Sequence, residues 1–111
     1  MRSKQQILSA LVNPGIVAVV RAHSAEQVLP LAEALLAGGI QAIEITMTTP
    51  NAIDAIARAS KRFGLDALIG VGTVLSADTA RQAIDAGTEF VGSPITHAEI
   101  ARAAAGAGRP G

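Results

Sequence analysis

The sequence contains no cysteine, no tryptophan, no tyrosine and only two phenylalanines. The lack of cysteine excludes a disulfide framework and a metal site built from thiolates. Nine basic and nine acidic residues balance to a net charge of zero, so the basic surface and stacking rings that nucleic-acid binding requires are both missing. No apolar run approaches membrane-spanning length, and the first residues do not follow the pattern of a signal peptide. We therefore expect a cytoplasmic protein.

Half of the 111 residues are hydrophobic, which makes an intrinsically disordered chain improbable. Alanine, isoleucine, leucine and valine supply nearly all of this apolar content. This composition is typical of buried parallel strands that are covered by alanine-rich helices. The length suits one modest domain with its own core.

Strands and helices are predicted to alternate along the chain. We expect a leading helix over residues 3–11, broken by Asn13-Pro14-Gly15, and then four strands over residues 16–20, 41–46, 67–71 and 89–92. Helices are expected over residues 24–37, 50–62 and 76–87 and from about residue 96, with Ser24 and Gln27 forming a capping box and Ser76 capping the third.

This alternation requires a parallel α/β sheet with right-handed crossovers. Two arrangements remain open at this point, an open doubly wound sheet and part of a (β/α)8 barrel. A complete barrel needs about 200 residues or more, so four units form at most its first half. We therefore predict that residues 1–111 form a single partial domain.

Polar residues with chemical uses stand at the ends of the four predicted strands. Arg21 ends the first, Glu44 and Thr46 lie on the second, Thr73 follows the third and Pro94 follows the fourth. Ligands of parallel α/β proteins bind at the carboxyl ends of strands, where these groups would converge. Strand alternation places Glu44 and Thr46 on the face opposite Ile43 and Ile45. Glu44 is thus a candidate proton donor and acceptor, although a structural ion pair would also explain it.

The remaining candidates also have structural interpretations. Arg21 could bind a carboxylate or form a surface ion pair, and Thr73 could contact a substrate or stabilise a turn. Gly70 and Gly72 could allow close approach of a ligand or only relieve packing. His23 and His97 lack the spacing of metal ligands, so we expect no metal. Residues 70–73 lack the third glycine of the dinucleotide fingerprint.

Four ordered segments resemble the amino-terminal half of the KDPG/KHG aldolases, namely residues 15–21 (GIVAVVR), 38–46 (GGIQAIEIT), 70–74 (GVGTV) and 90–94 (FVGSP). The resemblance implies a homotrimeric (β/α)8 barrel and a class I aldolase without metal or cofactor. Such enzymes cleave 2-keto-3-deoxy-6-phosphogluconate to pyruvate and glyceraldehyde 3-phosphate, or 4-hydroxy-2-oxoglutarate to pyruvate and glyoxylate. The resemblance also implies that Glu44 is the general acid/base, that Arg21 and Thr73 bind the pyruvyl end of the substrate, and that Pro94 lines the substrate pocket.

Two departures from the family pattern shape the functional expectation. Thr48 stands where some members carry an arginine, and the family's Schiff-base lysine lies on a later strand, whereas Lys4 and Lys61 are the only lysines here. We therefore expect a truncated chain that is inactive alone. The alternative is a non-catalytic half-barrel that self-associates or assembles with a partner. A phosphate-handling decarboxylase or epimerase is disfavoured, because the early strands carry no acidic and lysine cluster.

Overall fold

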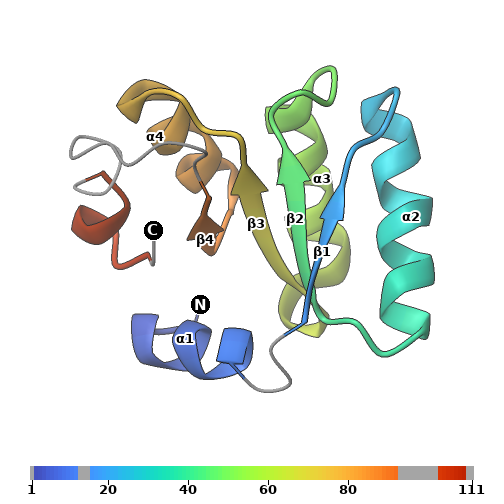
Figure 1. The fold of residues 1–111 in the computed structure, drawn as a ribbon, viewed down its shortest axis with the longest axis horizontal. Helices are drawn as coiled ribbons and strands as arrows, with labels where there is room; N and C mark the ends of the chain where they lie inside the picture. Colours follow the sequence, from blue (N-terminus) through green and yellow to red (C-terminus); the bar gives the residue numbers. More distant parts are fainter. Residues whose placement is uncertain (1, 13–15, 93–102, 110–111) are drawn as a thin grey trace.

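The computed structural model describes residues 2–12, 16–92 and 103–109, and a four-stranded parallel sheet forms its centre (Figure 1). The strands follow one another in the order β1-β2-β3-β4, with all three neighbouring pairs parallel. Their bounds are Val17–Val20 (β1), Ala42–Thr46 (β2), Leu68–Gly72 (β3) and Phe90–Val91 (β4). A doubly wound sheet reverses its strand order at a switch point. The described strands show no such reversal, so the sheet has the order of consecutive units of a barrel.

Three helices cover the outer face of this sheet, namely α2 (Ala25–Ala37), α3 (Ala52–Phe63) and α4 (Ala77–Ala86). Ile43 and Ile45 of β2 point into this layer and are fully buried, as strand alternation predicted. The helices present small side chains to the sheet, and Ala59 and Ala83 are fully buried. Small helix residues let the helix backbones approach the strands closely, which explains the alanine-rich composition.

A fourth helix, α1 (Lys4–Val12), covers the amino-terminal end of the inner face. Ile7 of this helix packs against Ala42, Leu68 and Phe90, one residue from each of the strands β2, β3 and β4. Arg2, just before the helix, donates a hydrogen bond of 2.6 Å to the carbonyl oxygen of Leu65 and one of 2.5 Å to Glu89. These contacts fix the helix across the end of the sheet.

The predicted helices agree with the observed ones to within about two residues, but one capping prediction is wrong. The Ser24 side chain makes no capping hydrogen bond, and the Gln27 side chain accepts the backbone N–H of His23 at 2.9 Å instead. Ser76 does cap α4, because its hydroxyl oxygen accepts the N–H of Thr79 at 3.1 Å.

The burial of β1 also differs from the prediction. The composition indicated buried parallel strands, yet Val17 of β1 is 38% exposed and Val19 is 59% exposed. Both side chains belong to the inner face, where the buried cluster around Ile7 of α1 includes one residue each of β2, β3 and β4 and none of β1. A bilayer-crossing helix is absent from residues 2–12, 16–92 and 103–109, where the longest helix, α2, has 13 residues.

Candidate active site

Glu44 lies on the inner face at the middle of β2, opposite Val19 of β1 and Gly70 of β3. Its side chain extends across β3 towards β4. A Cβ atom at Gly72 would lie 2.5 Å from Oε2 of Glu44, and one at Gly92 would lie 2.5 Å from Oε1. Since neighbouring strands are about 4.8 Å apart, the carboxylate lies well away from its own backbone. It sits directly on the backbone at the carboxyl ends of β3 and β4.

The environment of this carboxylate is unusual for an acidic side chain. Burial raises the pKa of Glu44 above its ordinary value, because partial removal of water disfavours the charged form. No described lysine or arginine forms an ion pair with it, whereas all five described ion pairs involve other residues. A carboxyl group with a raised pKa and no cation beside it is suited to holding and releasing a proton nearer neutral pH.

Threonine hydroxyls organise the loops around this position. The hydroxyl groups of Thr46 and Thr48 are hydrogen-bonded at 2.7 Å, and Thr46 is almost completely buried. Thr49 accepts the backbone N–H of Ala22 at 3.3 Å, which joins the loop after β1 to the loop after β2. These hydrogen bonds hold the loop after β1 and the loop after β2 in a fixed position relative to each other.

Backbone strain is also concentrated at this end of the sheet. Thr73 directly follows β3 and has a φ angle of 60°, and Asn51 at the start of α3 has a φ angle of 56°. This left-handed region is rare for residues other than glycine and is least favourable for β-branched side chains. Among the described residues, these are the two non-glycine positions with positive φ. Such strain persists where the surrounding structure holds it, which is common at functional sites.

The structure places the predicted site residues as follows. The carboxylate of Glu44 reaches Gly72 at the carboxyl end of β3, which Thr73 directly follows, and Arg21 is exposed immediately after β1 at the same end of the sheet. Pro94 lies outside the described residues, as does the helix expected from about residue 96. Sequence reasoning missed Gly92. Its position at the end of a short strand could have indicated a role in the site, because a glycine there often marks the close approach of another group.

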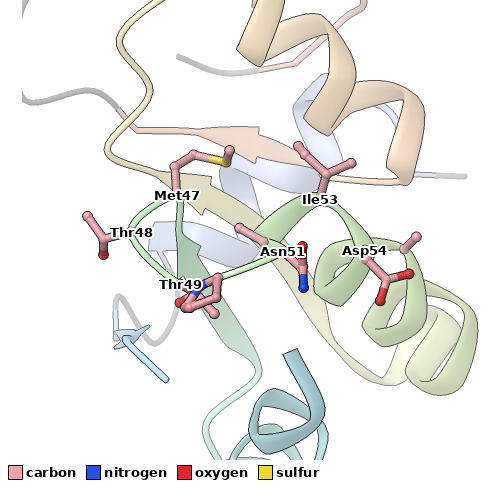
Figure 2. Close-up of a pocket in the computed structure, with 9 residues that line it drawn as sticks. Met47, Thr48, Thr49, Asn51, Ile53 and Asp54 are labelled. Atoms are coloured by element: carbon pink, nitrogen blue, oxygen red, sulfur yellow. The ribbon is translucent and has the colours of Figure 1, made fainter. Parts of the chain in front are cut away.

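A hollow of about 800 Å³ lies beside this site, on the loop after β2 and the first turns of α3. Figure 2 shows Met47, Thr48 and Asn51 on this loop, with Ile53 and Asp54 at the start of the helix. The lining does not include Glu44, Arg21 or Thr73. We therefore place the candidate chemistry at the inner face of the sheet and not in this hollow.

The two lysines of the chain lie far from the carboxyl ends of the strands. Lys4 begins α1 and Lys61 lies in the last turn of α3, so both belong to the amino-terminal end of the sheet, and both are exposed. Among residues 2–12, 16–92 and 103–109, no three histidine, aspartate or glutamate side chains gather in a group that could hold a metal ion.

The family match and the curated relatives named below belong to one group of enzymes. The family described as KDPG and KHG aldolase matches residues 7–109. The 2-dehydro-3-deoxy-phosphogluconate aldolase of Treponema pallidum (strain Nichols) is 39% identical over 104 residues, which are 94% of this chain and 49% of that protein. The chain spans about half the length, or less, of the curated relatives it matches.

Two solved structures show the same arrangement of strands and helices. The 2-keto-3-deoxy-6-phosphogluconate aldolase of Zymomonas mobilis ZM4, with 3-phosphoglycerate, superposes with a TM-score of 0.82 at 32% identity, over 97% of this chain and 52% of that one. The KDPG aldolase of Legionella pneumophila, with pyruvate captured as a covalent carbinolamine, gives a TM-score of 0.77 at 38% identity, over 85% and 45% of the two chains.

Proposed function

Because the chain belongs to the KDPG and KHG aldolase family, we propose that it carries the acid–base and carboxylate-binding part of a Schiff-base aldolase site. The proposed substrates are 2-keto-3-deoxy-6-phosphogluconate, cleaved to pyruvate and glyceraldehyde 3-phosphate, and 4-hydroxy-2-oxoglutarate, cleaved to pyruvate and glyoxylate. The observation that carries the proposal is the carboxylate of Glu44, which is partly buried at the carboxyl ends of β3 and β4 and forms no ion pair with a described lysine or arginine.

The proposed reaction begins when a lysine amine adds to the keto carbon of the substrate. Glu44 donates a proton to the hydroxyl group that leaves as water, and an iminium forms. The Glu44 carboxylate then takes the proton of the hydroxyl group beside the breaking carbon–carbon bond, the aldehyde departs and the electron pair of that bond remains as an enamine. Glu44 returns a proton to the enamine carbon before hydrolysis releases pyruvate. The carbinolamine in the Legionella pneumophila relative supports a covalent route of this kind.

Three further residues have proposed roles in binding. Arg21 lies exposed after β1, where its guanidinium is available to bind the carboxylate of a keto acid through two parallel hydrogen bonds. Thr73, held in its strained conformation next to Gly72, is proposed to hydrogen-bond the pyruvyl end. Pro94 is proposed to line the same pocket. We propose neither a metal nor a cofactor.

The amine is the part of the site that the described residues do not supply. Lys4 and Lys61 both lie at the opposite end of the sheet from Glu44. We therefore propose that the 111-residue chain alone forms no Schiff base with pyruvate and has no retro-aldol activity. A homotrimer and a cytoplasmic location are proposed for the whole protein from its family.

Trapping of the Schiff base tests this proposal directly. The chain is incubated with pyruvate and borohydride and analysed by mass spectrometry, with no adduct expected. A chimera that joins residues 1–109 to the following half of the Treponema pallidum relative is expected to form the adduct and to cleave substrate. In that chimera, Glu44→Gln should lower kcat by about 10²- to 10⁴-fold. The matched control is Glu26→Gln on the exposed surface of α2. An adduct on Lys4 or Lys61, or full activity of the Glu44→Gln chimera, contradicts the proposal.

A second candidate function follows from the exposed side chains of β1. Val19 of β1 is 59% exposed, Ile16 just before this strand is 57% exposed, and β1 is an outer strand of the described sheet. Exposed apolar strand edges favour association with another sheet. The second candidate is thus a non-catalytic half-barrel that self-associates, and sedimentation analysis would detect it as a stable folded dimer. A folded monomer would eliminate it.

A further inference from the structure

Glycine occupies three positions on the inner face of β3 and at the end of β4. Gly70 and Gly72 are separated by one residue on β3, and Gly92 directly follows β4. A Cβ atom at Gly70 would overlap the ring of Phe90, whereas the heavy atom nearest to a Cβ atom at Gly72 or at Gly92 is a carboxylate oxygen of Glu44. The first glycine therefore accommodates an aromatic ring, and the other two accommodate the carboxylate.

The direction in which Glu44 leans follows from its neighbours in the sheet. On one side, β1 places the branched side chain of Val19 directly opposite Glu44. On the other side, β3 places Gly70 opposite it and Gly72 one position further along the inner face. The residues opposite lack a side chain only on this second side, and there the ring of Phe90 occupies the space over Gly70, which leaves the space over Gly72 for Glu44. The glutamate therefore extends over β3, and Oε1 reaches Gly92 of the next strand.

We propose that Gly72 and Gly92 are positioning residues that hold the carboxyl group of Glu44 over the carboxyl ends of β3 and β4. From there its proton is delivered beside Thr73 and not over β2 or towards Arg21. A side chain at residue 92 would drive the carboxyl group back towards β2 and β1. The inference rests on the proposed role of Glu44, but the position of the carboxyl group is measurable without any reaction.

The two glycines differ in how a substitution would act. At residue 92, a Cβ atom would meet Oε1 at 2.5 Å, which is the end of a flexible side chain, and the next contacts lie at 3.4 and 3.5 Å. At residue 72, it would meet Oε2, Cδ and Cγ at 2.5, 2.7 and 3.0 Å. Gly92→Ala is therefore expected to move the carboxylate while the fold is retained. Gly72→Ala is expected to displace the whole outer half of the side chain.

Carbon-13 NMR titration of the Glu44 carboxyl group in the full 111-residue chain tests the proposal. In Gly92→Ala, the titration midpoint of Glu44 is expected to fall towards the ordinary glutamate value of about 4.3, because the displaced carboxyl group regains water. Arg21 follows β1, the strand beside β2. If the displaced carboxyl group approached the guanidinium of Arg21, the titration midpoint of Glu44 would fall further. The matched control is Gly106→Ala, since a Cβ atom there meets no heavy atom within 4 Å.

Several outcomes decide between positioning and mere packing. Folded Gly72→Ala and Gly92→Ala variants that keep the wild-type midpoint of Glu44 would overturn the proposal. If Gly92→Ala does not fold, the double variant Glu44→Ala/Gly92→Ala provides the test. It lacks the carboxylate that the alanine would displace, so it is expected to fold. A double variant that also fails to fold would overturn the proposal. An inactive chimera would count against the proposed function alone, because the titration involves no substrate.

Discussion

The two ends of the inner sheet face are built by the same strands and differ in most of their physical properties. At the amino-terminal end, Ile7 packs against Ala42, Leu68 and Phe90, and none of these side chains is more than 7% exposed. Glu44 lies two residues after Ala42 on β2, and from this position on the inner face is polar. At the first end, called the sealed end below, α1 covers β2, β3 and β4. The other end carries the candidate chemistry.

Charge and strain follow the same division. Arg2 and Glu89 at the sealed end form an ion pair of 2.5 Å with side chains only 19% and 12% exposed. Glu44 at the carboxyl end has no such partner among residues 2–12, 16–92 and 103–109, and the strained Thr73 directly follows Gly72, on which the carboxylate of Glu44 lies. Interactions that stabilise the fold therefore gather at one end, while groups that cost stability gather at the other. This separation lets loops at the carboxyl end change chemistry without weakening the seal.

The comparison predicts that the largest loss of stability comes from the sealed end. Phe90→Ala removes a buried ring from the contact with Ile7 and Gly70, and should lower the free energy of unfolding by about 4 kcal/mol. Urea denaturation at pH 7 measures this change. Leu65→Ala is the control, because Leu65 is 73% exposed and should change stability little. Equal effects of the two substitutions would show that α1 does not seal this end.

The ion pair should give the next largest effect. Arg2→Ala leaves Glu89 buried without its cation and should lower the free energy of unfolding by about 3 kcal/mol. Adding Glu89→Gln removes the unpaired charge and should recover part of that loss. Arg58→Ala, which breaks an exposed pair with Asp54, should cost less than about 1 kcal/mol. Similar costs for the two arginine substitutions would contradict a special role of the sealed end.

At the carboxyl end, a substitution should stabilise the protein. Thr73→Gly relieves a left-handed conformation that is unfavourable for a β-branched residue, with an expected gain of about 1 kcal/mol in the free energy of unfolding. Asn51→Gly should gain less, because asparagine tolerates this conformation better. Thermal melting of both variants provides the measurement, and a larger gain for Asn51→Gly would argue against strain at Thr73.

The smallest expected effect is the pH dependence contributed by Glu44. Its pKa is raised in the folded state, so the folded protein binds more protons than the unfolded chain between the ordinary and the raised value. Stability from this group is therefore present at low pH and is lost as the pH rises through the raised pKa. Glu44→Gln should be slightly more stable than wild type at pH 7 and equal to it below about pH 4. Urea denaturation at both pH values would reveal a contrary trend.

Much of the fold could be predicted because its signals are local. Alternation in β2 correctly placed Glu44 and Thr46 on the face opposite Ile43 and Ile45. Ser76 was correctly predicted to cap α4, because this contact spans only three residues. The Ser24 prediction failed because the Gln27 N–H donates to the carbonyl oxygen of Ser24 at 3.3 Å and not to its hydroxyl, while the Gln27 side chain accepts the N–H of His23. The sequence pattern does not distinguish between such near neighbours.

The sequence by itself determined the alternation of strands and helices and the faces on which polar and apolar side chains stand, because both depend on residues a few positions apart. Tertiary structure alone decided which way Glu44 leans, that Gly92 lies beneath its carboxylate, and that Val19 remains exposed. Those features depend on the register of neighbouring strands and on what covers each face. Contacts between segments more than twenty residues apart create them, and no local pattern records such contacts.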